Sequence, residues 1–161
     1  MQKLCIPVMI ALLLLGIAGC EKPDAAAPGD TTVGMYLQVI CDLHENEAER
    51  PVKSIALDLS GAGNLSEEEK ADLVSAVQSS YPAAEVSAAT YDQLTEDGRM
   101  ENGVFGDGVL FTLSVIEADE QEIAFEVSKW HAPDDACGYD RCRASLENGQ
   151  WEVTLDDSWA A

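Results

Sequence analysis

The stretch VKSIALDLSGAGNLSEEEKADLVSAVQSSYP, residues 52–82, decides the fold class because its hydrophobic period changes once along its length. In the first part, Ile55, Leu57 and Leu59 alternate with small or polar residues, which predicts a β-strand. The second part has a helical period, carried by Leu73, Val74, Val77 and Tyr81. A strand followed by a helix is therefore expected here.

The start of this helix is predicted by the spacing of Ser66 and Glu69. A serine followed three residues later by a glutamate is the pattern of a capping box, in which each side chain accepts a hydrogen bond from the other residue's backbone N–H. Pro82 fits the end of the helix, since proline rarely continues one. The glycine-containing segment before Ser66 is then a strand-to-helix loop.

A second amphipathic helix is predicted upstream, in residues 31–45. Its apolar positions fall at i, i+3, i+4 and i+7, and Thr31 or Thr32 is a suitable N-cap. The apolar positions are Tyr36, Val39, Ile40 and Leu43. Downstream, we expect a short strand at residues 85–88 and a helical turn at 91–94.

From residue 103 onward the pattern is that of strands only. The runs GVLFTLSVI (108–116), EIAFEVSKW (122–130) and GQWEVTL (149–155) are rich in β-branched and aromatic residues. The sequence therefore predicts an α+β fold, with two helices packed on one face of a mainly antiparallel sheet of about four or five strands. This order of elements and the closing GQWEV strand resemble small secreted bacterial domains with a cystatin-like or NTF2-like layout, a resemblance that implies a fold and no activity.

The N-terminal sequence predicts the subcellular location. Lys3 precedes a short apolar run that ends in small residues, the pattern of a secretory signal. The four residues Ile17-Ala18-Gly19-Cys20 resemble the lipobox of bacterial lipoproteins, which implies cleavage before Cys20 and lipidation of that residue. We therefore expect a signal peptide at 1–19, a lipidated Cys20 with a flexible tether at 20–30, and one domain at 31–161.

The predicted location is the cell envelope, where the N-terminal lipid holds the protein to a membrane. Glu21 follows the lipidated cysteine, and the residue associated with inner-membrane retention at that position is aspartate. In a Gram-negative source, the expected location is the periplasmic face of the outer membrane.

The charge of the chain restricts its partners. The formal net charge is −21, and removal of Lys3 with the signal would make it more negative. Such a surface repels phosphate backbones, which excludes nucleic acid as a favoured partner, and it attracts cationic proteins.

Residues 58–69, DLSGAGNLSEEE, raise the alternative of a calcium loop. Asp58, Ser60 and Glu69 fall at the first, third and twelfth positions of an EF-hand pattern. Ala62 stands at the fifth position and offers no side-chain oxygen, and the capping box already explains Glu69. A strand-to-helix loop is the favoured interpretation, and calcium stays open as an alternative.

The cysteines and histidines leave a second alternative. Cys41 and His44 could join His131 and the later cysteines in a zinc-like ligand set. In HAPDDACGYDRC, residues 131–142, Cys137 and Cys142 instead flank a turn-like sequence, and an exported chain favours a disulfide between them. We expect an exposed loop closed by this disulfide.

Three functions follow as hypotheses. The first is a non-enzymatic binding or accessory module that presents its sheet or the 131–142 loop to a partner, for which a cationic protein suits the charge. The second is a Ca²⁺- or Zn²⁺-binding protein, and the third a small hydrolase with a carboxylate or His131 as base. No cofactor is expected, since motifs such as the P-loop and G-x-G-x-x-G are missing from the sequence.

Overall fold

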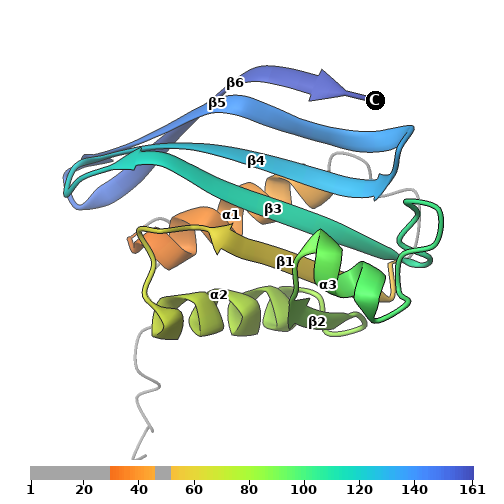
Figure 1. The fold of residues 1–161 in the computed structure, drawn as a ribbon. Helices are drawn as coiled ribbons and strands as arrows, with labels where there is room; N and C mark the ends of the chain where they lie inside the picture. Colours follow the sequence, from red (N-terminus) through yellow and green to blue (C-terminus); the bar gives the residue numbers. More distant parts are fainter. Residues whose placement is uncertain (1–29, 46–51) are drawn as a thin grey trace, which may run out of the picture.

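The computed structural model describes residues 30–45 and 52–161, which form three helices and one six-stranded sheet (Figure 1). The helices are α1 (Thr32–Glu45), α2 (Glu67–Ser80) and α3 (Tyr91–Glu96). The strands are β1 (Ser54–Gly61), β2 (Glu85–Ala88), β3 (Gly108–Ala118), β4 (Glu122–Ala132), β5 (Asp135–Glu147) and β6 (Gln150–Ala160).

The sheet has the strand order β2-β1-β3-β4-β5-β6 and mixes two kinds of pairing. β1 lies between β2 and β3 and is parallel to both, whereas β3 to β6 form an antiparallel meander. The predicted α+β class and the mainly antiparallel sheet are thus confirmed. The sheet has one strand more than the upper predicted number, and α3 is a third helix.

The helices divide between the two faces of the sheet. α1 and α2 cover one face and pack on every second residue of β1 and β3, for example Leu57 and Phe111. The neighbouring residues Ala56 and Leu110 point to the opposite face, where they contact Leu94 of α3. The two predicted helices therefore do share one face, and α3 forms a smaller second core.

Local signals set the helix starts as the sequence predicts. Thr31 Oγ1 accepts a hydrogen bond from the backbone N–H of Gly34 at 3.0 Å, which caps α1. At α2, Ser66 Oγ accepts from Glu69 N–H at 3.3 Å while Glu69 Oε2 accepts from Ser66 N–H at 2.8 Å. The capping box is confirmed.

The prediction for residues 131–142 is wrong. The turn there consists of Pro133 and Asp134 alone, and the following residues belong to β5. Cys137 and Cys142 lie in this one strand, so their Cα atoms are separated by roughly 16 Å at about 3.3 Å per residue. A disulfide needs less than about 7 Å between Cα atoms, so this structure does not join the two cysteines. The expected exposed loop and its disulfide are therefore absent.

The predicted signal peptide, Cys20 and nearly all of the tether lie outside the described residues. Among the helices of residues 30–45 and 52–161, none is long and apolar enough to cross a membrane.

Candidate functional site

The last strand, β6, forms one edge of the sheet in the part of the chain that the structure describes (Figure 1). It runs for 11 residues, and the two-residue turn before it is shaped by positive φ at Asn148 and Gly149. An edge strand directs every second backbone N–H and C=O away from its neighbour. β6 therefore has backbone hydrogen-bonding groups available to another strand, along a length at least that of an average strand.

The side chains of β6 divide into an apolar row and an acidic row. Trp151, Val153 and Leu155 pack on the helix-covered core but stay half-buried. Glu152 and Asp156 alternate with them and are exposed. Because strand neighbours point to opposite faces, a strand added beside β6 would meet an apolar row on one face and carboxylates on the other.

The acidic row continues onto neighbouring strands. Glu152 lies beside Ser145 of β5, which lies beside Glu122 of β4, so these side chains share one face. Arg141 of β5 is paired with Asp157, with 2.8 Å between Nε and Oδ2. Arg143 of β5 lies beside Thr154 and therefore shares the face of Glu152 and Asp156. The excess of negative charge that would favour a cationic partner is that of the whole chain, formally −21.

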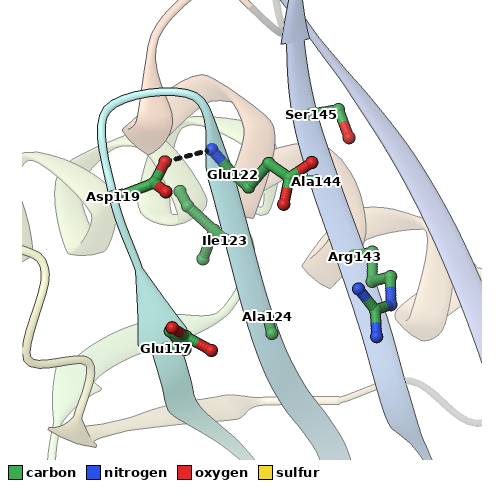
Figure 2. Close-up of a pocket in the computed structure, with 8 residues that line it drawn as sticks. All are labelled: Glu117, Asp119, Glu122, Ile123, Ala124, Arg143, Ala144 and Ser145. Carbon is green, nitrogen blue, oxygen red and sulfur yellow. Dashed lines mark hydrogen bonds between the residues drawn. The ribbon is translucent and has the colours of Figure 1, made fainter.

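A small pocket of about 130 Å³ lies at the tip of the β3–β4 hairpin (Figure 2). Asp119 Oδ1 accepts the backbone N–H groups of Gln121 and Glu122 at 2.8 Å each, which holds the turn and lowers the pKa of Asp119. In Figure 2 the Glu122 carboxylate extends toward β5, and Glu117 lies apart on β3. The three acidic residues do not converge on one point, so this pocket has the features of an acidic turn.

Of the predicted calcium ligands, Asp58 and Ser60 lie together and Glu69 has a separate role. Asp58 Oδ1 accepts from the Ser60 N–H at 3.0 Å and from its hydroxyl at 2.6 Å, at the end of β1. Glu69 instead forms hydrogen bonds with Ser66. The Ser66 backbone N–H lowers the pKa of the Glu69 carboxyl most, and the Ser66 hydroxyl lowers it further. Each residue thus has a local structural bond without any ion.

Cys41 and His44 lie on α1 and are both half-buried. The His44 ring packs edge-on against Tyr81 and Phe111, at centroid distances of 4.7 and 5.9 Å. Burial, followed by the charge of Lys129, lowers the His44 pKa. Burial, and then the neighbouring Cys41 thiol, raises the pKa of the Tyr81 hydroxyl. His44 is therefore a half-buried residue of α1 whose environment favours the neutral ring.

His131 is held elsewhere, on β4. Its Nδ1 lies 2.8 Å from the carbonyl oxygen of Gly108, which requires a proton on that nitrogen. Within residues 30–45 and 52–161, no group of three His, Cys, Asp or Glu residues could hold a metal ion. The predicted Cys41, His44 and His131 set is thus not brought together as a metal site.

Cys142 is buried, and its thiol lies 3.8 Å from the carbonyl oxygen of Tyr139. Burial, and then the charges of Glu126, Asp140 and Asp156, raise its pKa to about 12. Such a thiol is unreactive at neutral pH, because the thiolate is the nucleophile.

The edge position of β6 was not predicted from the sequence. The run GQWEVTL identified a strand, and its acidic residues were visible. Edge position depends on which strands pair, and no local pattern in this sequence signals that.

Searches with this chain found no matching protein-family model, curated protein or solved structure. The resemblances to bacterial lipoproteins and to cystatin-like or NTF2-like domains stay predictions.

Proposed function

We propose that this chain is a lipid-anchored accessory protein of the cell envelope, which binds an extended cationic protein segment along β6. The observation that carries the proposal is the edge strand itself, with 11 residues, a half-buried apolar row and exposed carboxylates. Strand addition uses backbone hydrogen bonds for affinity and alternate side chains for specificity.

The sign of the charge selects the partner. Proteins commonly protect exposed edges with lysine or proline, and β6 has neither. Its exposed charges are Glu152, Asp156 and Asp157, all negative, and Asp157 is paired with Arg141 of β5. A second copy of this chain would bring like charges together, since the formal net charge is −21. A lysine- or arginine-bearing strand is favoured instead.

The anchoring half of the proposal rests on the lipobox sequence. Asp30, where the described domain begins, has its Oδ1 3.3 Å from the Gln150 amide at the start of β6. A tether of about ten residues spans at most roughly 35 Å when extended. The turn between β5 and β6 would then stay close to the membrane, so the proposed partner is another component of the membrane surface.

Binding is tested with an eight-residue peptide in which Lys and Val alternate, added to the purified full-length chain in neutral detergent. We expect saturable binding, measured by calorimetry, that weakens as salt is raised. The same peptide with N-methyl groups on alternate residues should fail to bind, because it cannot complete a ladder of hydrogen bonds. Equal binding of both peptides would refute strand addition.

The edge is tested with the double variant Glu152→Gln/Asp156→Asn. Removing two surface charges should cost about 1 kcal/mol, which is roughly a fivefold loss of affinity. The matched control is Glu68→Gln/Asp72→Asn on the exposed side of α2, which removes the same charge far from β6. An equal loss in both variants would show a general charge effect and refute β6 as the site.

The anchor is tested separately by Cys20→Ala. We expect the wild-type chain in the membrane fraction and the variant in the soluble fraction after export. An unchanged distribution would reject lipidation at Cys20 and would leave the peptide-binding result standing.

A further inference from the structure

A second cavity lies at the other end of the sheet, where β2 stops before β1. β2 pairs only with residues 54–57 of β1, and the last bond joins Ala89 N–H to the Leu57 carbonyl at 3.1 Å. The chain then turns into α3. In the described part of the chain, the last residues of β1 therefore have no strand beside them on this side.

The helices leave this point on opposite faces. α2 follows β1 and packs on one face, whereas α3 follows β2 and packs on the other. Their first turns flank the carboxyl ends of β1 and β2 and line an open cavity of about 380 Å³. In sheets with parallel strands, ligands commonly bind in the crevice outside the carboxyl ends, where successive connections diverge. The volume lies in the range of small-molecule sites.

The lining combines an apolar wall with few charged groups. Val74, Ala88 and Ala89 supply apolar surface. Lys70 and Glu67 also line the cavity as an ion pair, with 2.9 Å between Nζ and Oε1. The remaining charge in the lining is the carboxylate of Asp58.

Asp58 has one oxygen available. Its Oδ1 is engaged by Ser60, and among the described residues its Oδ2 has no hydrogen-bond partner. The bonds from Ser60 fix the carboxylate in one orientation, so its free oxygen needs little ordering when a ligand arrives. This carboxylate can accept a hydrogen bond from a cation beside the apolar wall.

We propose that the cavity between α2 and α3 binds a small organic cation, with a protonated amine on Asp58 and an apolar body against Val74 and the two alanines. A carboxylate ligand is disfavoured because it would meet Asp58 within a chain of net charge −21. This site is separate from β6 and does not depend on the proposed peptide binding.

The test uses cyclohexylammonium as the probe, with cyclohexanol and cyclohexanecarboxylate as neutral and anionic counterparts of the same shape. In NMR titrations of the full-length chain, we expect the ammonium to shift the amide resonances of Asp58, Ser60 and Gln93 with a saturable curve. Cyclohexanol should bind at least tenfold more weakly, and the carboxylate weakest of all. Equal affinity of the amine and the alcohol, or no saturable shift, would overturn the proposal.

The variant Asp58→Asn keeps an Oδ1 acceptor for Ser60 and removes the charge, so the fold should be retained. Its affinity for the amine should fall at least tenfold. The control Asp92→Asn removes one exposed charge from the first turn of α3 outside the cavity lining, and should change affinity less than twofold. A similar loss in both variants would refute a specific role for Asp58.

Discussion

The capping box at α2 allows a quantitative prediction from three hydrogen bonds. Ser66 Oγ accepts from Glu69 N–H at 3.3 Å and donates to Glu69 Oε2 at 2.8 Å, and the Ser66 N–H donates to the same oxygen at 2.8 Å. Ser66→Ala removes the first two bonds and leaves the third. Loss of an N-cap side chain costs about 1 kcal/mol in the free energy of unfolding. For a domain of this size, that lowers Tm by roughly 3–5 °C.

The pH dependence follows from the same bonds. The pKa of Glu69 is lowered by the Ser66 backbone N–H and then by its hydroxyl, so the ionised carboxylate stabilises the fold. This stabilisation is present above the unfolded pKa of about 4.3 and is lost as pH falls through the lower folded value. The destabilisation caused by Ser66→Ala should therefore be smaller at pH 3 than at pH 7.

Urea denaturation of the wild type, Ser66→Ala, Glu69→Ala and the double variant measures both effects. A coupling free energy between the two residues of about 0.5–1 kcal/mol is expected at pH 7. The series is repeated with EGTA and with Ca²⁺, and with Mg²⁺ as the control ion. Additive effects of the two substitutions, or a Ca²⁺-specific stabilisation that Glu69→Ala abolishes, would refute the capping argument and support the calcium loop.

Three further outcomes follow from the buried residues. The pKa of His44 is lowered by burial and then by the charge of Lys129, so neutral His44 stabilises the fold above about pH 6.5 and this contribution is lost as pH falls below that value. Between pH 7.5 and 5, His44→Phe should therefore lose less stability than the wild type in urea denaturation, and an equal loss would contradict this. Cys142, with a pKa of about 12, should resist iodoacetamide at pH 8 in the native chain and react fully in urea. Mass spectrometry measures that reaction, and loss of two hydrogens from a Cys142-containing disulfide would show that its thiol is not free. Gly138→Ala should destabilise by about 1–3 kcal/mol, because its Cβ would lie 2.6 Å from the Val127 carbonyl oxygen and 2.9 Å from Trp159 Cζ2. Unchanged tryptophan fluorescence and an unchanged Tm would contradict this packing.

The sequence predicted those elements whose signal is local. The helical stripe around Tyr36 and Ile40 gave α1, and the Ser66–Glu69 spacing gave the start of α2. Both signals depend on residues three or four apart, which contact each other within one helix. Such contacts do not require knowledge of the rest of the chain.

β5 was missed because its sequence is poor in strand-forming residues. Gly138 and Asp140 favour turns, yet Gly138 is required here by the close approach of the Val127 carbonyl oxygen and of the Trp159 ring. Asp140 lies at an irregularity where the register between β4 and β5 shifts between Phe125 and Val127. Pairing with two neighbouring strands outweighs the local preference. Without β5, the two cysteines flank a turn-like sequence, and that pattern wrongly predicts a disulfide between them.

Local sequence patterns also do not predict the position of β1 within the sheet. The run around Ile55 and Leu57 predicts a strand, but its parallel neighbours depend on the crossovers through α2 and α3. The cavity beside Asp58 exists because β2 is four residues shorter than β1. Asp58 and Ser60 are candidate calcium ligands in the sequence, whereas the ligand proposed for the Asp58 carboxylate is an organic cation.

The two proposed sites can be distinguished because the sheet keeps them apart. Three strands lie between β1 and β6, so four inter-strand spacings separate them. At about 4.8 Å per spacing, β1 and β6 are roughly 19 Å apart. Substitutions this distant, with no shared contacts, have additive effects on free energy. Asp58→Asn should therefore leave binding of the Lys-Val peptide unchanged, and Glu152→Gln/Asp156→Asn should leave cyclohexylammonium binding unchanged. If each variant weakened both ligands equally, the common cause would be the overall charge of the chain, and neither β6 nor the cavity would be a specific site.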